Sequence, residues 1–307
     1  GGSGLGIAAL IPVVEAMGKG LMGTPLVSTV LAGELIRRAG GIAEEDILED
    51  ISGGCPATVA YLDGSDWGGA NVGVSIDASG VLSGRKFMVP DAAQATWIVV
   101  VGSDVEGEAV IALVAGSDVA AQAQASHALI DLTKRASTLD FTGVTAQNVL
   151  SGDKVASAIR DYLLIGALLT AAEAVGSTSA CLAGIVDYLK TRKQFGKLIG
   201  SFQALKHPTV DIYVGMEHSR SLVYHASSEI DDGPLSIEAE VACRMAKAKA
   251  SDTIQYAGDR SVQFHGGFGF TWDCDSSLFI RRAAWSQQHF GDAMHHRKRL
   301  APLLLDG

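Results

Sequence analysis

Two stretches of the C-terminal half decide the fold: Arg192-Lys-Gln-Phe-Gly-Lys-Leu-Ile-Gly-Ser-Phe-Gln203 and Gln263-Phe-His-Gly-Gly-Phe-Gly-Phe270. Each separates two long segments in which apolar residues recur with the period of an α-helix. Ser236, followed by Glu238 and Glu240, predicts the N-cap of one of these helices. Four helices are expected, over residues 156–193, 201–230, 236–265 and 276–304. Long helices with short connections predict an antiparallel four-helix bundle.

The residues before the predicted bundle have a different hydrophobic pattern. Helical spacing over 7–17, 25–38 and 44–51 gives way after Cys55 to short β-branched runs between turn residues. The clearest runs are 72–76, 86–89, 98–101 and 110–114. The sequence therefore predicts an α+β fold with an N-terminal helical domain (1–53), a middle β-domain (54–150) and a bundle (151–307). The Gly-rich start resembles the interior of a domain, so we expect the first domain to be partial.

Composition excludes several functions. The net charge of −10 has the wrong sign for a protein that neutralises nucleic-acid phosphates. The four cysteines form no CxxC pair and no cluster at metal spacing, which favours a reduced, cytoplasmic protein without a metal site. The apolar segment 163–186 is long enough to span a membrane, but its Ala, Gly, Ser and Thr content favours a buried bundle helix.

The two stretches, the second together with Phe279-Ile-Arg-Arg282, resemble the "RxxFG…Q" and "QxxGGxG…RD" segments of acyl-CoA dehydrogenases. The resemblance implies the acyl-CoA dehydrogenase fold, an FAD cofactor, an acyl-CoA substrate and an electron-transfer acceptor. It also implies that six residues bind the adenosine and pyrophosphate half of an FAD held mainly by a neighbouring subunit: Arg192, Phe195, Gln203, Gln263, Gly266 and Gly267. The residue types suit this role, because a pyrophosphate needs a cation with paired donors and closely approaching backbone.

The sequence departs from the family where catalysis would occur. These enzymes need a glutamate that removes the α-proton of the thioester while the flavin accepts the β-hydride. The two positions at which the family places it correspond to Gly166 and Phe290, and neither side chain can accept a proton. The family's flavin-holding "TEPxxGSD" loop corresponds to residues 57–66, where only Gly64-Ser-Asp66 is recognisable.

The sequence lacks the catalytic glutamate and most of the flavin-holding loop, but it keeps the residues that would reach a neighbouring subunit's FAD. We therefore expect a non-catalytic subunit of a heteromeric enzyme, similar to the α2β2 acyl-CoA dehydrogenases of actinobacteria, several of which act on steroid side-chain CoA esters. The expected partner is a homologous subunit that carries the glutamate and binds most of the acyl-CoA. Two alternatives stay open: a homomeric enzyme that uses Asp292 or Glu173 as base, and a flavin-free scaffold protein.

Overall fold

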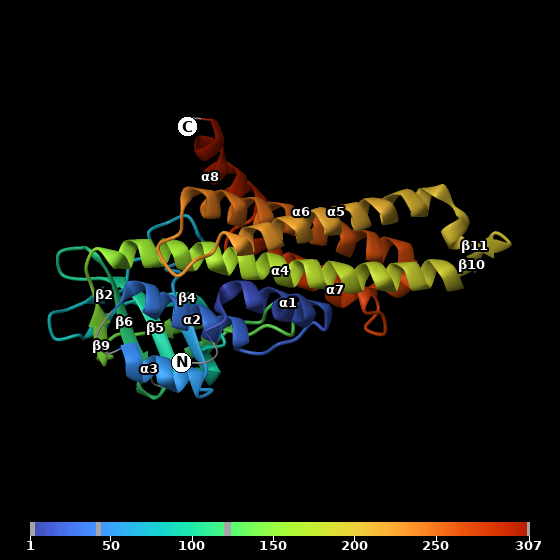
Figure 1. Cartoon of the computed structure of the whole chain (residues 1–307). Helices are drawn as coiled ribbons and strands as arrows, with labels where there is room; N and C mark the ends of the chain where they lie inside the picture. Colours follow the sequence, from blue (N-terminus) through green and yellow to red (C-terminus); the bar gives the residue numbers. More distant parts are fainter. Residues whose placement is uncertain (1–3, 41–43, 120–123, 306–307) are drawn as a thin grey trace. The chain divides into compact units, whose positions relative to one another are not determined.

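The computed structural model describes residues 4–40, 44–119 and 124–305. Helices come first along the chain, strands follow, and long helices return (Figure 1), so the expected α+β class is confirmed. The chain forms two compact units. The first is built mainly from residues 23–166 with Asp232–Pro234, and the second from 6–22, 167–231 and 235–307. The division into three domains stays a prediction.

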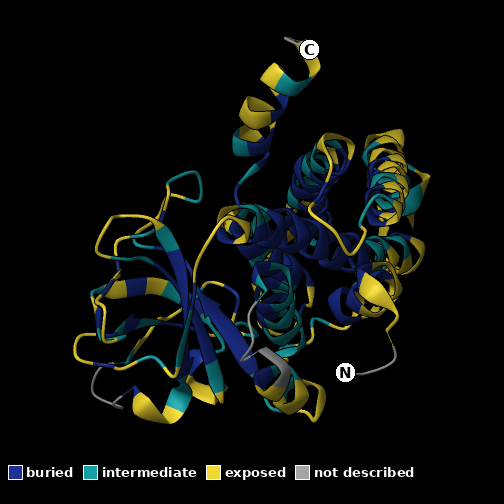
Figure 2. Cartoon of the chain, turned by 60° about the vertical axis from the view of Figure 1, so that its left-hand side comes forward, coloured by how far each residue is buried: buried dark blue, intermediate teal, exposed yellow. Residues whose placement is uncertain are grey.

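The first unit contains the sheets. Strands β5 (Trp97–Ser103) and β6 (Ala109–Ala115) are antiparallel neighbours in a six-stranded sheet ordered β3-β2-β5-β6-β9, with β1 parallel to β5. Their middle residues are buried, and apolar runs of this length without alternation suit strands covered on both faces (Figure 2). The remaining strands of this sheet are β1 (Ala57–Ala60), β2 (Ser75–Ile76), β3 (Leu82–Ser83) and β9 (Asn148–Leu150).

A second sheet has the order β4 (Arg85–Pro90), β8 (Ala136–Asp140) and β7 (Gln124–Ser126). Helices α2 (Leu26–Ala39) and α3 (Glu44–Ser52) and the 3₁₀ turns Ala92–Gln94 and Gly116–Asp118 complete this unit. The strand expected over 72–76 is limited to Ser75–Ile76, which corrects the prediction. The Val72 carbonyl accepts from the Ser103 hydroxyl, and the Gly73 N–H donates to the Asp63 carboxylate, so the backbone of these two residues bonds to side chains instead of a ladder.

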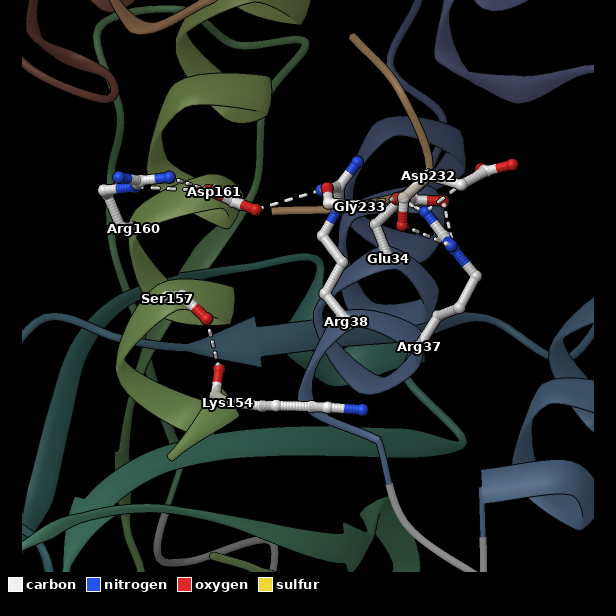
Figure 3. Close-up of polar contacts among 9 residues, drawn as sticks. All are labelled: Glu34, Arg37, Arg38, Lys154, Ser157, Arg160, Asp161, Asp232 and Gly233. Atoms are coloured by element: carbon white, nitrogen blue, oxygen red, sulfur yellow. Dashed lines mark hydrogen bonds and ion pairs between the residues drawn. The ribbon is translucent and has the colours of Figure 1, made fainter. Parts of the chain in front are cut away.

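An ionic network lies at the end of α2 in the first unit (Figure 3). Arg38 Nη1 donates to Asp161 Oδ2 at 2.9 Å and Nε to Glu34 Oε2 at 3.1 Å, and both Arg38 and Asp161 side chains are buried. Arg37 and Arg38 also donate to the carbonyls of Asp232 and Gly233. These bonds make the loop Asp232–Pro234 part of the first unit although it joins two helices of the second.

The second unit is helical. Helix α6 (Ile237–His265) packs against α5 (Gln203–Ser228), α7 (Ser276–Gln288) and α8 (Ala293–Leu305). Helix α4 (Lys154–Thr191) contributes its residues from Ala167 onward, and α1 (Gly6–Lys19) belongs to the same unit. The Ser236 hydroxyl accepts from the Ala239 N–H at 3.1 Å, which confirms the predicted N-cap.

One helix among the described residues, α4, passes the length and composition test for a membrane span. Its apolar window is 78% buried within the protein, as in a core helix. Small side chains allow this burial. A Cβ on Gly176 would lie 1.8 Å from the Glu15 carbonyl oxygen, so α1 touches α4 where glycine provides room.

The single helix expected over 276–304 is wrong, because α7 and α8 are separate. Phe290 and Gly291 have φ angles of 58° and 89°, in the left-handed region that no helix interior contains. Asp292 Oδ1 then accepts from the His295 N–H at 2.7 Å and caps α8. The pair Gly291-Asp292 is the sequence signal for the end of α7 and the beginning of α8.

Candidate functional site

The first of the two deciding stretches forms a projecting hairpin. Helix α4 ends at Thr191, and β10 (Lys193–Gln194) pairs with β11 (Lys197–Leu198). The two turn residues, Phe195 and Gly196, have φ angles of 54° and 79°, as a type I′ turn requires. Phenylalanine is uncommon at such angles. Its ring is 91% exposed, so the turn presents an aromatic side chain to the outside.

The second stretch ends α6 and leaves open space beside two glycines. Gly266 has a φ of 61°, a conformation that suits glycine, and its N–H bonds the Gln263 carbonyl. No atom lies within 4 Å of a Cβ built on Gly266 or Gly267. The 3₁₀ turn Gly266–Phe270 follows, and Gly269 anchors it, because a Cβ there would lie 2.6 Å from the Val262 carbonyl oxygen. The backbone at Gly266-Gly267 is therefore open to a ligand.

The two stretches meet at a pocket of about 830 Å³ in the second unit. It brings together four of the six predicted FAD-binding residues: Arg192, Phe195, Gly266 and Gly267. Gln203, the first residue of α5, and Gln263, in the last turn of α6, are exposed and do not line it. Their role stays a prediction. The other lining residues are Tyr188, Gln194, Ile199, Phe202, Ala204, Leu205, Phe264, His265 and Phe268.

An aromatic pair in the pocket wall was not predicted from the sequence. The rings of Tyr188 and His265 stack with centroids 4.2 Å apart, and His265 Nδ1 lies 2.8 Å from the Ser261 carbonyl oxygen. Tyr188 precedes Arg192 by four residues, and the Arg192 N–H donates to the Tyr188 carbonyl at 2.9 Å, so the two residues lie close together at the end of α4. The four-residue spacing from Arg192 could have identified Tyr188 as a pocket residue from the sequence. The stacking of Tyr188 on His265 requires α4 to pack against α6, so no short sequence pattern predicts it.

The chain segment that carries Arg192 is cationic, although the whole chain has a net charge of −10. Residues 187–207 contain five Lys or Arg residues and one Asp. Lys197 Nζ lies 4.4 Å from the centroid of the Phe202 ring, whereas the exposed Arg192 guanidinium has no partner among the described residues. A partly apolar hollow with open glycine backbone and an available guanidinium suits a flat ligand that carries phosphate.

The two positions at which the family places its base offer no proton acceptor. Gly166 is buried within α4. Phe290 is buried in the left-handed turn between α7 and α8, and its carbonyl accepts from His296 Nε2 at 2.9 Å.

The two alternative bases are already engaged. Buried Glu173 Oε1 accepts from buried Arg282 Nη1 at 2.9 Å. Removing the charge of either partner would leave the other buried charge poorly compensated. Asp292 uses its carboxylate to cap α8. Both arrangements favour structural roles for these carboxylates.

The loop that replaces "TEPxxGSD" bonds to neighbouring residues of the first unit. The Asp63 carboxylate accepts from Lys86 Nζ at 2.6 Å and from the Gly73 N–H at 2.7 Å. The Tyr61 ring stacks on Trp67, with centroids 5.9 Å apart and planes at 19°, and the Tyr61 hydroxyl donates to the Gly69 carbonyl. Among the described residues no group of three His, Cys, Asp or Glu side chains could hold a metal ion.

Residues 156–302 match the family described as acyl-CoA dehydrogenase, C-terminal domain. Residues 156–302 are thus similar to the C-terminal domain of acyl-CoA dehydrogenases. The resemblance expected from the two stretches is confirmed there. Acyl-CoA dehydrogenase IpdE2 of Mycolicibacterium smegmatis is 37% identical over 134 residues, which cover 44% of this chain and 40% of the relative. The matched part thus spans less than half of that relative.

Solved structures extend the likeness to the whole fold. The Tcur3481-Tcur3483 steroid ACAD G363A variant superposes with a TM-score of 0.85 at 25% identity, covering 99% of this chain and 82% of that chain. The ChsE4-ChsE5 complex from Mycobacterium tuberculosis gives 0.84 at 24% identity, with the same coverage. PigA, solved as an FAD complex, gives 0.85 at 22% identity and covers 100% of this chain and 85% of that chain. The expected acyl-CoA dehydrogenase fold is confirmed.

Proposed function

We propose that this chain is the non-catalytic subunit of a heteromeric, FAD-dependent acyl-CoA dehydrogenase. Its pocket would hold the adenosine and pyrophosphate half of an FAD whose flavin end lies in a homologous subunit. That partner would carry the catalytic glutamate and most of the acyl-CoA site. The complex would introduce a double bond between Cα and Cβ of the thioester and pass the electrons to an electron-transfer protein.

One observation carries this proposal: the pocket gathers Arg192, Phe195, Gly266 and Gly267, while Gly166 and Phe290 offer no base. The fit to a dinucleotide is chemical. The Arg192 guanidinium has no partner in the described chain, and the two glycines face open space, so both are available to phosphate oxygens. A chain that had lost FAD altogether would have no use for this combination.

The roles of the side chains follow from their chemistry. When bound, FAD supplies the acceptor for the hydride that leaves Cβ. Arg192 neutralises the pyrophosphate, and Phe195 and the Tyr188–His265 pair offer aromatic faces for the adenine ring. Gly266 and Gly267 let the backbone approach the phosphates. This chain contributes binding and orientation, and the proton transfer belongs to the partner.

We propose steroid side-chain CoA thioesters as the substrate class. The support is likeness: the Tcur3481-Tcur3483 steroid ACAD variant has the same fold at 25% identity. Family likeness is the sole warrant for this part of the proposal.

The test compares the lone chain with the chain co-expressed with a homologous acyl-CoA dehydrogenase subunit from the same source that carries a glutamate at the position of Gly166 or Phe290. We expect flavin absorbance and dehydrogenase activity in the complex and neither in the lone chain. Arg192→Gln should weaken FAD binding by the complex at least about tenfold, because it removes charged hydrogen bonds to phosphate. Arg299→Gln, an exposed arginine on α8, serves as the matched control. A full complement of FAD and full activity in the lone chain would refute the proposal.

A further inference from the structure

A rigid aromatic turn continues outward from the pocket in the second unit. Phe270 is 81% exposed and Trp272 is 69% exposed, although aromatic side chains of this size are usually mostly buried. Phe268, two residues earlier, is also exposed and lines the pocket. The three rings alternate along the chain and project from one short segment, which we call the aromatic turn (residues 266–275).

The aromatic turn is held by its own backbone. The Thr271 N–H and hydroxyl both donate to the Phe268 carbonyl, at 3.0 Å and 2.8 Å, and the Cys274 N–H donates to the Thr271 carbonyl. Gly269 is buried against α6, and the turn also contacts α7. The exposed rings therefore stand on a fixed support, which reduces the conformational entropy that binding would cost.

A cation completes the surface. The Arg281 guanidinium, from α7, lies 4.5 Å from the centroid of the Trp272 ring, within the range of a cation–π interaction. Tryptophan and arginine are among the residues that most often dominate the energetics of protein interfaces. Fixed aromatic rings beside an arginine have the composition of an interface centre and not of a solvated loop.

We infer that Phe270, Trp272 and Arg281 form the docking surface for the homologous subunit that holds the flavin end of the FAD. This inference rests on the proposed function. Phe268 belongs both to the pocket and to the aromatic turn, so the two surfaces are continuous. A chain that holds the other end of a dinucleotide seated in this pocket must approach the same end of the bundle. The same subunit therefore covers the exposed rings.

The test measures the affinity between this chain and the homologous glutamate-bearing subunit used in the co-expression test, with Phe270→Ser, Trp272→Ser and Arg281→Gln variants. We expect the two serine variants each to raise the Kd at least about tenfold. Arg281→Gln should raise the Kd by a smaller factor. Met294→Ser, on α8, is the matched control because its side chain is 77% exposed, and its Kd should equal that of the wild type. Unchanged circular dichroism and Tm exclude misfolding.

Three outcomes would overturn the inference. An unchanged Kd in the Phe270→Ser/Trp272→Ser double variant removes the docking role. A stable dimer of the lone chain that this double substitution dissolves assigns the surface to a second copy of the chain. Binding to phosphatidylglycerol vesicles that is lost in the double variant, with the subunit complex intact, assigns it to a lipid surface.

Failure of the docking surface is distinguishable from failure of the proposed function. Arg192→Gln should leave the subunit complex assembled but lower its FAD content, whereas the double variant should lose complex and FAD together. If Arg192→Gln leaves FAD binding intact while the double variant prevents assembly, the docking surface stands and the proposed FAD half-site fails.

Discussion

A single buried lysine holds the turn between α7 and α8. Lys247 Nζ donates to Ser251 Oγ at 2.9 Å and to the carbonyls of Ser286 and Gly291 at 2.9 Å and 2.7 Å. Burial lowers the pKa of Lys247 from 10.5 to about 7, and the charge of Asp292 opposes that shift. Burial also lowers the pKa of His296 to about 2, with the Lys247 charge acting in the same direction. The lysine is therefore the group near the turn that changes charge in the alkaline range.

The stability of the protein should rise with pH because of Lys247. Between pH 7 and 10.5 the lysine is protonated in the unfolded chain and increasingly neutral in the folded one, so the unfolded state binds more protons. Its contribution to the free energy of unfolding increases by up to about 1.4 kcal/mol per pH unit in that window and is lost as pH falls through 7. Urea unfolding across the window should show this slope in the wild type and its loss in Lys247→Met. Lys298→Met, on the exposed face of α8, should keep the wild-type slope, and equal slopes in all three proteins would refute the prediction.

At the scale of elements, the sequence predicted the helices whose apolar period is unbroken. Helices α4, α5 and α6 begin and end within two residues of the expected ranges 156–193, 201–230 and 236–265, because burial of one face requires that period. The α7–α8 break depends on Phe290 in a left-handed conformation, which hydrophobic periodicity does not encode. Likewise the motifs located Arg192 and Gly266, while the Tyr188–His265 stack forms only when α4 meets α6.

The contact between α1 and α4 depends on glycine in α4. A Cβ on Gly176 would lie 1.8 Å from the Glu15 carbonyl oxygen, so the two helices must separate in Gly176→Ala. Such overpacking should lower the free energy of unfolding by about 1–3 kcal/mol. Gly184→Ala is the matched control on the same helix, since nothing lies within 4 Å of a Cβ there. Gly184→Ala should raise the free energy of unfolding by about 0.5–1 kcal/mol, because alanine favours the helix more than glycine does. Chemical denaturation of both variants measures the contrast, and a neutral Gly176→Ala would contradict it.

At the scale of the whole molecule, each compact unit is assembled from segments far apart in the sequence. The first unit holds α2, the beginning of α4 and the loop Asp232–Pro234 together through the network of Figure 3. Asp161 is the acceptor from α4 in this network, and Arg38 the donor from α2 that also reaches the Gly233 carbonyl. The integrity of the unit therefore depends on a buried charge pair between segments that no local pattern relates.

Substitution of Asp161 tests this dependence. In Asp161→Asn the buried Arg38 keeps Glu34 but loses its second carboxylate, so we expect the free energy of unfolding to fall by about 2–3 kcal/mol. Amide exchange should accelerate in Asp232–Gly233, because the guanidinium that bonds this loop is no longer fixed. Arg160→Gln removes the other partner of Asp161, but that guanidinium is 41% exposed, so its loss should change stability by at most about 1 kcal/mol. Equal effects of the two substitutions, or unchanged exchange in the loop, would show that the buried pair does not hold these segments together.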